Sequence, residues 1–176
     1  MNEFSKQISE KLSFRRAEYC DVPAIGAILK AAVKRMLAEG KRQWDDSYPN
    51  ETHVSADIDR GVGYVIECDG APIAYGAVVF DGEPAYDALR GRWLSDGPYV
   101  VIHRLAVSQE MQGKGLGRLF MNCVADFARS KGVHSFKVDT NFDNFAMLHL
   151  LDRLGFTYCG EVQYSRGSRK AFEKPI

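Results

Sequence analysis

Hydrophobic residues between positions 100 and 131 follow first the period of a strand and then that of a helix. Val100, Val101 and Ile102 are β-branched and open an apolar run to residue 107 that only His103 and Arg104 interrupt, which predicts a buried strand. Glycines then occupy alternate positions from 113 to 117. One helical face follows at spacings of three and four residues, formed by Leu116, Leu119, Phe120, Cys123, Val124, Phe127 and Ala128. The stretch therefore predicts a strand, a glycine-rich loop and an amphipathic helix.

The same two periods continue through the rest of the chain. They predict strands over residues 12–17, 63–68, 73–80, 135–140, 156–164 and 169–174, and helices over 21–40, 52–60 and 144–154. Asp69-Gly70 is typical of the tight turn in a β-hairpin, and Asp21 is a favourable first residue for the first helix. Helices and strands that alternate, with two hairpins among them, predict an α/β (α+β) domain with a mixed, mostly antiparallel sheet flanked by helices.

Composition narrows the class of protein. A chain of 176 residues with 45% hydrophobic and 26% charged residues suits one domain, 1–176, with residues 1–10 as a loose segment or a short added helix. The formal net charge is zero and no block of like charges occurs, so we expect neither nucleic acid nor a membrane surface as a partner. The N-terminus has no signal-peptide pattern. The four cysteines lack metal-binding spacing, so we expect a reducing cytoplasm and no metal site.

The glycine-rich loop has a physical use at the start of a helix. Without Cβ atoms the backbone can approach a large ligand, and the free N–H groups of the first helical turn attract a phosphate or diphosphate. Lys114 and Arg118 add positive charge. A solvent-facing turn is the alternative for glycines alone. The spacing excludes both a P-loop and a G-x-G-x-x-G dinucleotide loop, because the third glycine of the latter is replaced by Arg118.

Gln112, Gly115 and Gly117 fit the pattern Q/R-x-x-G-x-G/A after a strand that ends in Leu105-Ala106-Val107. This arrangement resembles the acetyl-CoA loop of the GNAT family of N-acetyltransferases. Residues 144–156, which begin with Asn144 and end in Gly-Phe, resemble the second signature of that family, and residues 13–21 resemble its first strand and helix entry. The resemblance covers roughly residues 13–164.

The resemblance implies a single GNAT-like domain with about seven strands and about four helices, whose sheet splays between the fourth and fifth strands. It implies acetyl-CoA as cofactor and direct acetyl transfer to an amine. The residues that it assigns to the cofactor are Leu105, Ala106, Val107, Gln112, Gly113, Lys114, Gly115, Leu116, Gly117, Arg118 and Asn144. We expect a monomer or a homodimer.

His103 is the candidate base that removes a proton from the amine, because the ordinary pKa of histidine lies close to neutral pH and some family members carry a histidine on this strand. A histidine held by a structural hydrogen bond is the alternative. The family also implies that a backbone N–H of this strand, that of Leu105 or Ala106, donates to the thioester carbonyl oxygen. Many relatives have a tyrosine, as general acid for the thiolate, where this chain has Leu151. Tyr158 and His149 are substitutes by residue type only.

Aromatic residues in two polar connections are candidates for the acceptor side. Trp44, Asp45 and Tyr48 follow the first long helix, where the family commonly lines its acceptor site, and Tyr86 and Trp93 lie in the connection 81–97. Either set could instead pack into the core. The acceptor could be a small molecule, an amino-acid derivative or a peptide. The alternative functions are a non-catalytic acyl-CoA-binding sensor, which the Leu151 position would allow, and a nucleotide-binding regulatory domain.

Overall fold

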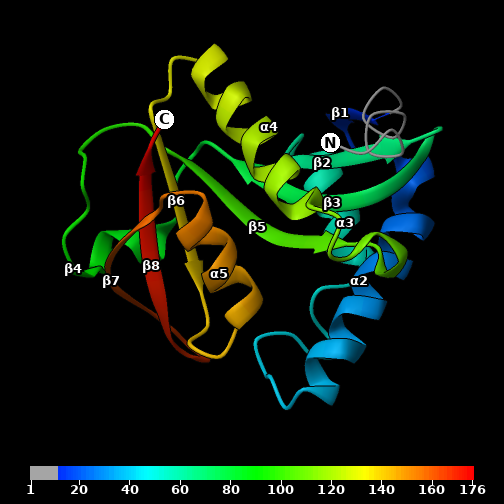
Figure 1. Ribbon diagram of the computed structural model, residues 1–176, viewed down its shortest axis with the longest axis horizontal. Coiled ribbons are helices and arrows are strands. Elements are labelled where there is room, and N and C mark those ends of the chain that lie inside the picture. The colour runs from blue at the N-terminus through cyan, green and yellow to red at the C-terminus, as the bar shows by residue number, and fades with distance from the viewer. Residues whose placement is uncertain (1–11) are drawn as a thin grey trace. The chain divides into compact units, whose positions relative to one another are not determined.

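The computed structural model describes residues 12–176, so the predicted loose segment 1–10 lies outside the described residues (Figure 1). The described chain forms two compact units. One contains residues 12–77 and 104–120, and the other contains residues 78–103 and 121–176. The chain passes from one unit to the other within β3 (Ala71–Val79), β5 (Val100–Val107) and α4 (Leu116–Ser130).

The first unit is built from a hairpin with two helices. Its elements are β1 (Leu12–Arg16), η1 (Tyr19–Asp21), α2 (Val22–Ala38), α3 (Glu51–Asp59), β2 (Gly63–Cys68), most of β3, the end of β5, η3 (Gln109–Met111) and the start of α4. The strand order is β1-β2-β3-β5, and β2 turns into β3 through Asp69-Gly70, both with positive φ. The predicted hairpin turn is therefore confirmed.

Asp21 precedes α2, as predicted, but its side chain does not cap the helix. The carboxylate instead accepts from Arg15 Nη1 at 2.7 Å, from Arg15 Nη2 at 3.0 Å and from the Glu18 backbone N–H at 2.8 Å. These three bonds tie β1 to the entry of α2. The hydrogen bonds from Arg15 hold the pKa of Asp21 below its ordinary value, against the opposing effect of burial.

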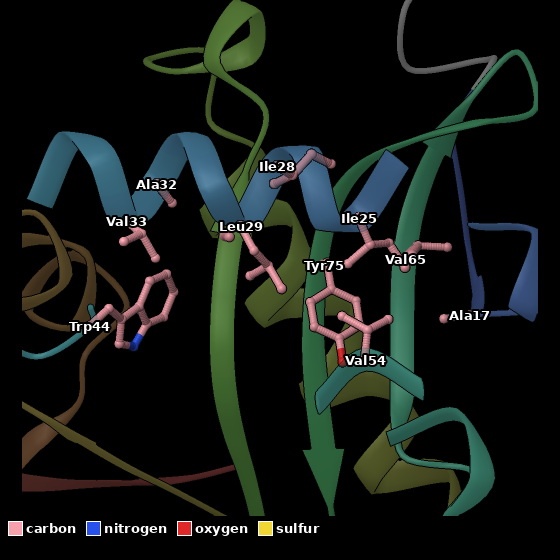
Figure 2. Close-up of a cluster of buried hydrophobic side chains, with 11 residues drawn as sticks. Ala17, Ile25, Ile28, Leu29, Ala32, Val33, Trp44, Val54, Val65 and Tyr75 are labelled. Carbon is pink, nitrogen blue, oxygen red and sulfur yellow. The ribbon is translucent and has the colours of Figure 1, made fainter. Parts of the chain in front are cut away.

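Helix α2 supplies much of the core of the first unit. Ile25, Leu29 and Val33 lie on one face of the helix and are at most 4% exposed. Figure 2 shows these side chains pointing from α2 toward Tyr75 of β3, Val65 of β2 and the ring of Trp44. Burying one such aliphatic side chain contributes about 2 kcal/mol, so this face fixes the position of α2 on its strands.

The second unit has the strand order β5-β6-β8-β7-β4. Its further elements are η2 (Pro84–Ala88), β4 (Arg90–Gly91), β6 (Ser135–Thr140), α5 (Phe145–Arg153), β7 (Thr157–Tyr164) and β8 (Gly167–Pro175). β5 pairs with β6 in parallel, whereas β6, β7, β8 and β4 pair antiparallel.

The predicted fold class is confirmed, with one difference in the strand count. Residues 12–176 contain four α-helices, as expected, and eight strands in a mixed, mostly antiparallel arrangement, where about seven were expected. The added strand is β4, whose two residues pair with Gly160 and Glu161 of β7. A two-residue strand carries no periodicity, so the sequence could not reveal it. None of the helices in the described part of the chain is long and apolar enough to span a bilayer.

Candidate active site

The glycine-rich loop presents bare backbone at the start of α4. Gly113 and Gly115 have φ of 72° and 81°, and a Cβ atom built on either would meet nothing within 4 Å. Among the described residues, five backbone N–H groups in the loop and the first turn of the helix donate to no acceptor. They belong to Gly113, Gly115, Leu116, Gly117 and Arg118. Lys114 and Arg118 are exposed beside them. The arrangement provides donors and positive charge for an anion, which is the environment that the sequence predicted for a diphosphate.

The backbone of β5 is irregular at one residue between the predicted base and the predicted oxyanion donor. Arg104, in the middle of this strand, has a φ of 56°, which is unfavourable for a residue with a side chain. Among the described residues, the ladder between β5 and β6 comprises only Val100 with Phe136 and Val101 with Lys137. The parallel pairing thus ends well before Leu105, Ala106 and Val107, which leaves their β6-side backbone groups outside that ladder.

Side-chain bonds hold Arg104 in this conformation. Its Nε lies 3.0 Å from Asp57 Oδ2, its Nη2 lies 2.6 Å from Asp57 Oδ1, and its Nη1 lies 3.0 Å from Tyr48 Oη. Tyr75, which is fully buried, donates its hydroxyl to Asp57. Burial and the charge of Asp57 raise the pKa of Tyr75 well above its ordinary value, so the hydroxyl keeps its proton and remains a donor.

His103 forms a pair with Glu83 in the second unit. The histidine Nε2 lies 3.3 Å from Glu83 Oε2, and both side chains are about four-fifths buried. The hydrogen bond from His103 holds the pKa of Glu83 below its ordinary value, although burial acts in the opposite direction. Glu83 also accepts from the Ala85 backbone N–H at 3.3 Å. A carboxylate beside one ring nitrogen fixes the orientation of the imidazole and leaves Nδ1 as the second functional nitrogen.

A buried carboxylate, Asp139 at the end of β6, gathers three donors in the same unit. Tyr86 Oη lies 2.8 Å and Tyr164 Oη 3.1 Å from its Oδ1, and Arg169 Nη1 lies 3.0 Å from its Oδ2. The Arg169 guanidinium also stacks on the Tyr164 ring at 4.3 Å. Burial, and then the charge of Asp139, raise the pKa of both tyrosines, so both remain protonated donors.

The connection 81–97 folds over with its aromatic residues inward. Tyr86 is 2% exposed, and Trp93 is half-buried and donates its Nε1 proton to the Tyr86 carbonyl oxygen at 3.2 Å. The Lys137 ammonium lies 4.4 Å from the Trp93 ring centroid. Of the two alternatives for Tyr86 and Trp93, this geometry fits packing within the unit. Burial of Tyr86 leaves its hydroxyl, on Asp139, as the group with which it could act.

In the connection after α2, the aromatic and acidic candidates lie in different environments. Trp44 is 8% exposed and packs in the core of the first unit beside Val33, which fits the core alternative (Figure 2). Tyr48 is half-buried and accepts from Arg104, whereas Asp45 Oδ1 accepts from the Ser47 backbone N–H at 2.8 Å. Asp45 also lines a pocket of about 420 Å³. The lining residues are Gly26, Lys30, Val33, Asp45, Asp46, Pro49, Asn50, Glu51 and Thr52.

The second signature forms helix α5 and its ends. Asn144 is the first residue before the helix, and its Oδ1 accepts from the Met147 backbone N–H at 3.3 Å. Leu151, at the position of the tyrosine in many relatives, is fully buried. Tyr158 is 51% exposed and has an edge contact with Phe172, and His149 is exposed on α5. Among the described residues, neither of these two forms a hydrogen bond or ion pair with His103, Glu83 or the three donors on Asp139.

The family model for the acetyltransferase (GNAT) family matches residues 29–156. This chain belongs to the GNAT family. The match covers both signatures, so the predicted family and the predicted class of enzyme, an N-acetyltransferase, are confirmed, and acetyl-CoA is the cofactor of the family.

Three known proteins illustrate the similarity. The L-methionine sulfoximine/L-methionine sulfone acetyltransferase of Pseudomonas paraeruginosa is 26% identical over 150 residues, which are 85% of this chain and 83% of that protein. A GNAT-family acetyltransferase structure from Streptococcus agalactiae is 32% identical, with a TM-score of 0.86 over 94% of this chain and 95% of that one. The structure of yncA from Salmonella typhimurium with acetyl-CoA is 22% identical over 94% of each chain, with a TM-score of 0.66, and shows the shared fold.

Several polar residues of the site were not identified from the sequence. Asp57 gave a usable signal, because it lies on the apolar face of α3 with Val54. Arg104 also gave one, as a charge inside a β-branched strand. Glu83, Asp139 and Arg169 gave none, since their partners are 20 to 53 positions away in the chain and only the fold brings them together.

Proposed function

We propose that this protein transfers the acetyl group of acetyl-CoA directly to an amine of a small molecule, an amino-acid derivative or a peptide. The observation that carries the proposal is the set of uncommitted N–H groups at the start of α4, which fits a diphosphate. An amine acceptor is also supported by the Pseudomonas paraeruginosa relative, whose name gives two amino-acid derivatives as its substrates.

The residues of the loop fit the cofactor. The N–H groups of Gly113, Gly115, Leu116, Gly117 and Arg118 would hold the diphosphate, with the side chains of Lys114 and Arg118 beside it and Gln112 at the entrance of the loop. The backbone of Leu105, Ala106 and Val107, which the β5–β6 ladder does not reach, would bind the pantetheine arm together with Asn144. When bound, acetyl-CoA supplies the activated acetyl group as a thioester.

His103 is the proposed base. An amine acceptor with a pKa near ~10 is mostly protonated at neutral pH and must lose a proton before it can attack. Glu83 holds Nε2 of the imidazole, so Nδ1 is the nitrogen that would accept this proton. The resulting imidazolium would be stabilised by the Glu83 carboxylate, which stays ionised at neutral pH because its pKa is lowered.

The backbone N–H of Leu105 is the proposed donor to the thioester carbonyl oxygen. One such donor typically contributes about 3 kcal/mol as negative charge develops on the oxygen. No proton donor for the thiolate stands at residue 151, because Leu151 is an apolar side chain in the core. A thiol with an ordinary pKa near ~8.5 is a tolerable leaving group, so water can supply this proton. Tyr158 stays a prediction by residue type.

On the acceptor side, Tyr48 and Asp45 are the proposed contacts in the first unit. Asp45 contributes a carboxylate to the pocket after α2, where Lys30 is accompanied by Asp46 and Glu51. That excess of negative charge favours a cationic amine. Trp44 is buried in the core and would support this connection without touching the acceptor. Tyr86 and Trp93 would likewise support the folded connection 81–97. A cytoplasmic location and a monomer or homodimer stay predictions.

Acetyl transfer with a panel of amines tests the proposal. We expect release of CoA that depends on an amine, and a drop of roughly 100-fold or more in kcat for His103→Ala with acetyl-CoA binding retained. A second candidate function is a non-catalytic acyl-CoA sensor, because the buried Leu151 cannot act as the general acid that many relatives have at this position. Tight acetyl-CoA binding with no transfer to any amine would favour that sensor.

A further inference from the structure

Arg169 of β8 has more hydrogen-bonding capacity than its ion pair uses. Its Nη1 bonds to Asp139 at 3.0 Å and its plane stacks on Tyr164. Among the described residues, its Nε and Nη2 donate to no acceptor. The guanidinium is four-fifths buried, and its orientation is fixed by the stack and by the bond to Asp139. A preoriented edge of N–H donors suits a planar anion.

The first unit shows what an arginine with a purely structural role looks like in this protein. Arg104 binds both carboxylate oxygens of Asp57 through two nitrogens and binds Tyr48 through the third. Arg15 binds both oxygens of Asp21 through Nη1 and Nη2, and binds Glu67 through Nε. Arg169 makes one bond to Asp139 where those two make two each. Tyr86 and Tyr164 already satisfy Asp139 Oδ1, so the carboxylate does not need a second bond from Arg169.

The same cluster contains the His103–Glu83 pair. Glu83 directly precedes η2, where the Tyr86 backbone N–H donates to the Glu83 carbonyl oxygen at 2.8 Å. The hydroxyl of the same Tyr86 donates to Asp139, which is the partner of Arg169. The proposed base, through Glu83, and the open edge of Arg169 therefore belong to one connected cluster in the second unit. The cluster offers a carboxylate and an imidazole for an ammonium group, and a guanidinium edge for an anion.

A free α-amino acid carries those two groups one carbon apart. We propose that Arg169 binds the carboxylate of the acceptor, so that the acceptor is an amino acid or amino-acid derivative with a free α-carboxylate. The inference rests on the proposed function and narrows it. A simple alkylamine lacks the carboxylate, and in a longer peptide the carboxylate lies far from the amine. For neither of these is the open edge of Arg169 satisfied.

The test compares each acceptor with its carboxamide. With wild-type protein and acetyl-CoA, kcat/KM is measured for L-methionine sulfone, L-methionine, L-leucine and L-phenylalanine and for the four matching amides. We expect the best acid to exceed its amide by about 100-fold, because the charge-assisted bonds from the Arg169 guanidinium to a carboxylate are lost with the uncharged analogue. Arg169→Gln should reduce this preference to less than about 5-fold by lowering the value for the acid alone, and Arg169→Lys should be intermediate.

Arg166→Gln is the matched control, because Arg166 is exposed in the turn of the same hairpin, and it should leave the preference unchanged. Thermal unfolding of each variant checks that it is folded. Equal kcat/KM for acids and amides in the wild type would overturn the role of Arg169, and so would equal losses for both in Arg169→Gln. Those outcomes would leave acetyl transfer itself intact. No transfer to any acid, amide or alkylamine would instead overturn the proposed function, and this inference with it.

Discussion

Arg104 and Asp57 form a two-point ion pair at the residue where β5 adopts a left-handed backbone. The bonds are 3.0 Å and 2.6 Å long, and the arginine has a φ of 56°. The conformation costs on the order of 1 kcal/mol by itself, and the bonds to Asp57 and Tyr48 offset that cost. Because Arg104 stands between His103 and Leu105, the pair also sets the local backbone between the proposed base and the proposed oxyanion donor.

Asp57→Asn is therefore expected to affect both stability and turnover. The substitution keeps the shape of the side chain but leaves a mostly buried guanidinium without its countercharge, and we expect a loss of about 3 kcal/mol in the free energy of unfolding. Urea unfolding measures it, and steady-state kinetics should show a lower kcat. Asp59→Asn, on the exposed side of the same helix, should change little. An unfolding free energy equal to that of the wild type would show that the pair is not needed to hold Arg104.

Glu83 is predicted to be a positioning residue for His103. Glu83→Gln keeps a group near Nε2 but removes the charge that would stabilise the imidazolium, so we expect kcat to fall about 10-fold. The KM for acetyl-CoA should not change, because Glu83 is not among the residues proposed to bind the cofactor. Asp87→Asn removes an exposed carboxylate from η2, the short helix that Glu83 precedes, and serves as the control. If Glu83 had only a structural role, Glu83→Gln would instead lower the thermal stability and leave kcat per folded molecule as in the wild type.

The elements of the fold could be predicted from the sequence, but the polar contacts of the site could not. Helix α4 and its glycine loop were identified because a period of 3.6 residues and alternate glycines are local patterns. Trp44 shows the limit of such patterns, because an aromatic residue in a polar connection is compatible with a core position or a binding wall, and only packing against α2 decides between them. Asp139 lies 53 positions from Tyr86 and 30 from Arg169, distances over which no local rule operates.

Acid should destabilise the first unit through Asp21. The pKa of this carboxyl is lowered in the folded state, chiefly by the hydrogen bonds from Arg15. The unfolded value is near ~3.9, so the stabilisation is fully present above that value and is lost as pH falls through the lower, folded pKa. Urea unfolding between pH 2 and 6 should show this dependence, and Asp21→Asn should flatten it. An equally steep fall in the variant would assign the dependence to other groups.

Gly115→Asp is expected to weaken acetyl-CoA binding at least 10-fold. The backbone of the new aspartate must adopt a φ near 81°, and its carboxylate would lie beside the proposed diphosphate position. Isothermal titration calorimetry measures the affinity. Gly132→Asp is the matched control, because Gly132 has a φ of 72° and equally open surroundings but follows the other end of α4. If the two variants bound acetyl-CoA equally, the Gly115 result would reflect backbone strain alone.

The central claim is that backbone N–H groups at the start of α4 bind the diphosphate of acetyl-CoA. Amide NMR of the ¹⁵N-labelled protein during titration with CoA tests it most directly, with pantetheine, which lacks the diphosphate, as the comparison. The account predicts large downfield shifts of the Gly115, Leu116, Gly117 and Arg118 amide protons with CoA and small ones with pantetheine. If the protein were saturated with CoA and the chemical shifts of these four amide protons did not change, the result would contradict the claim.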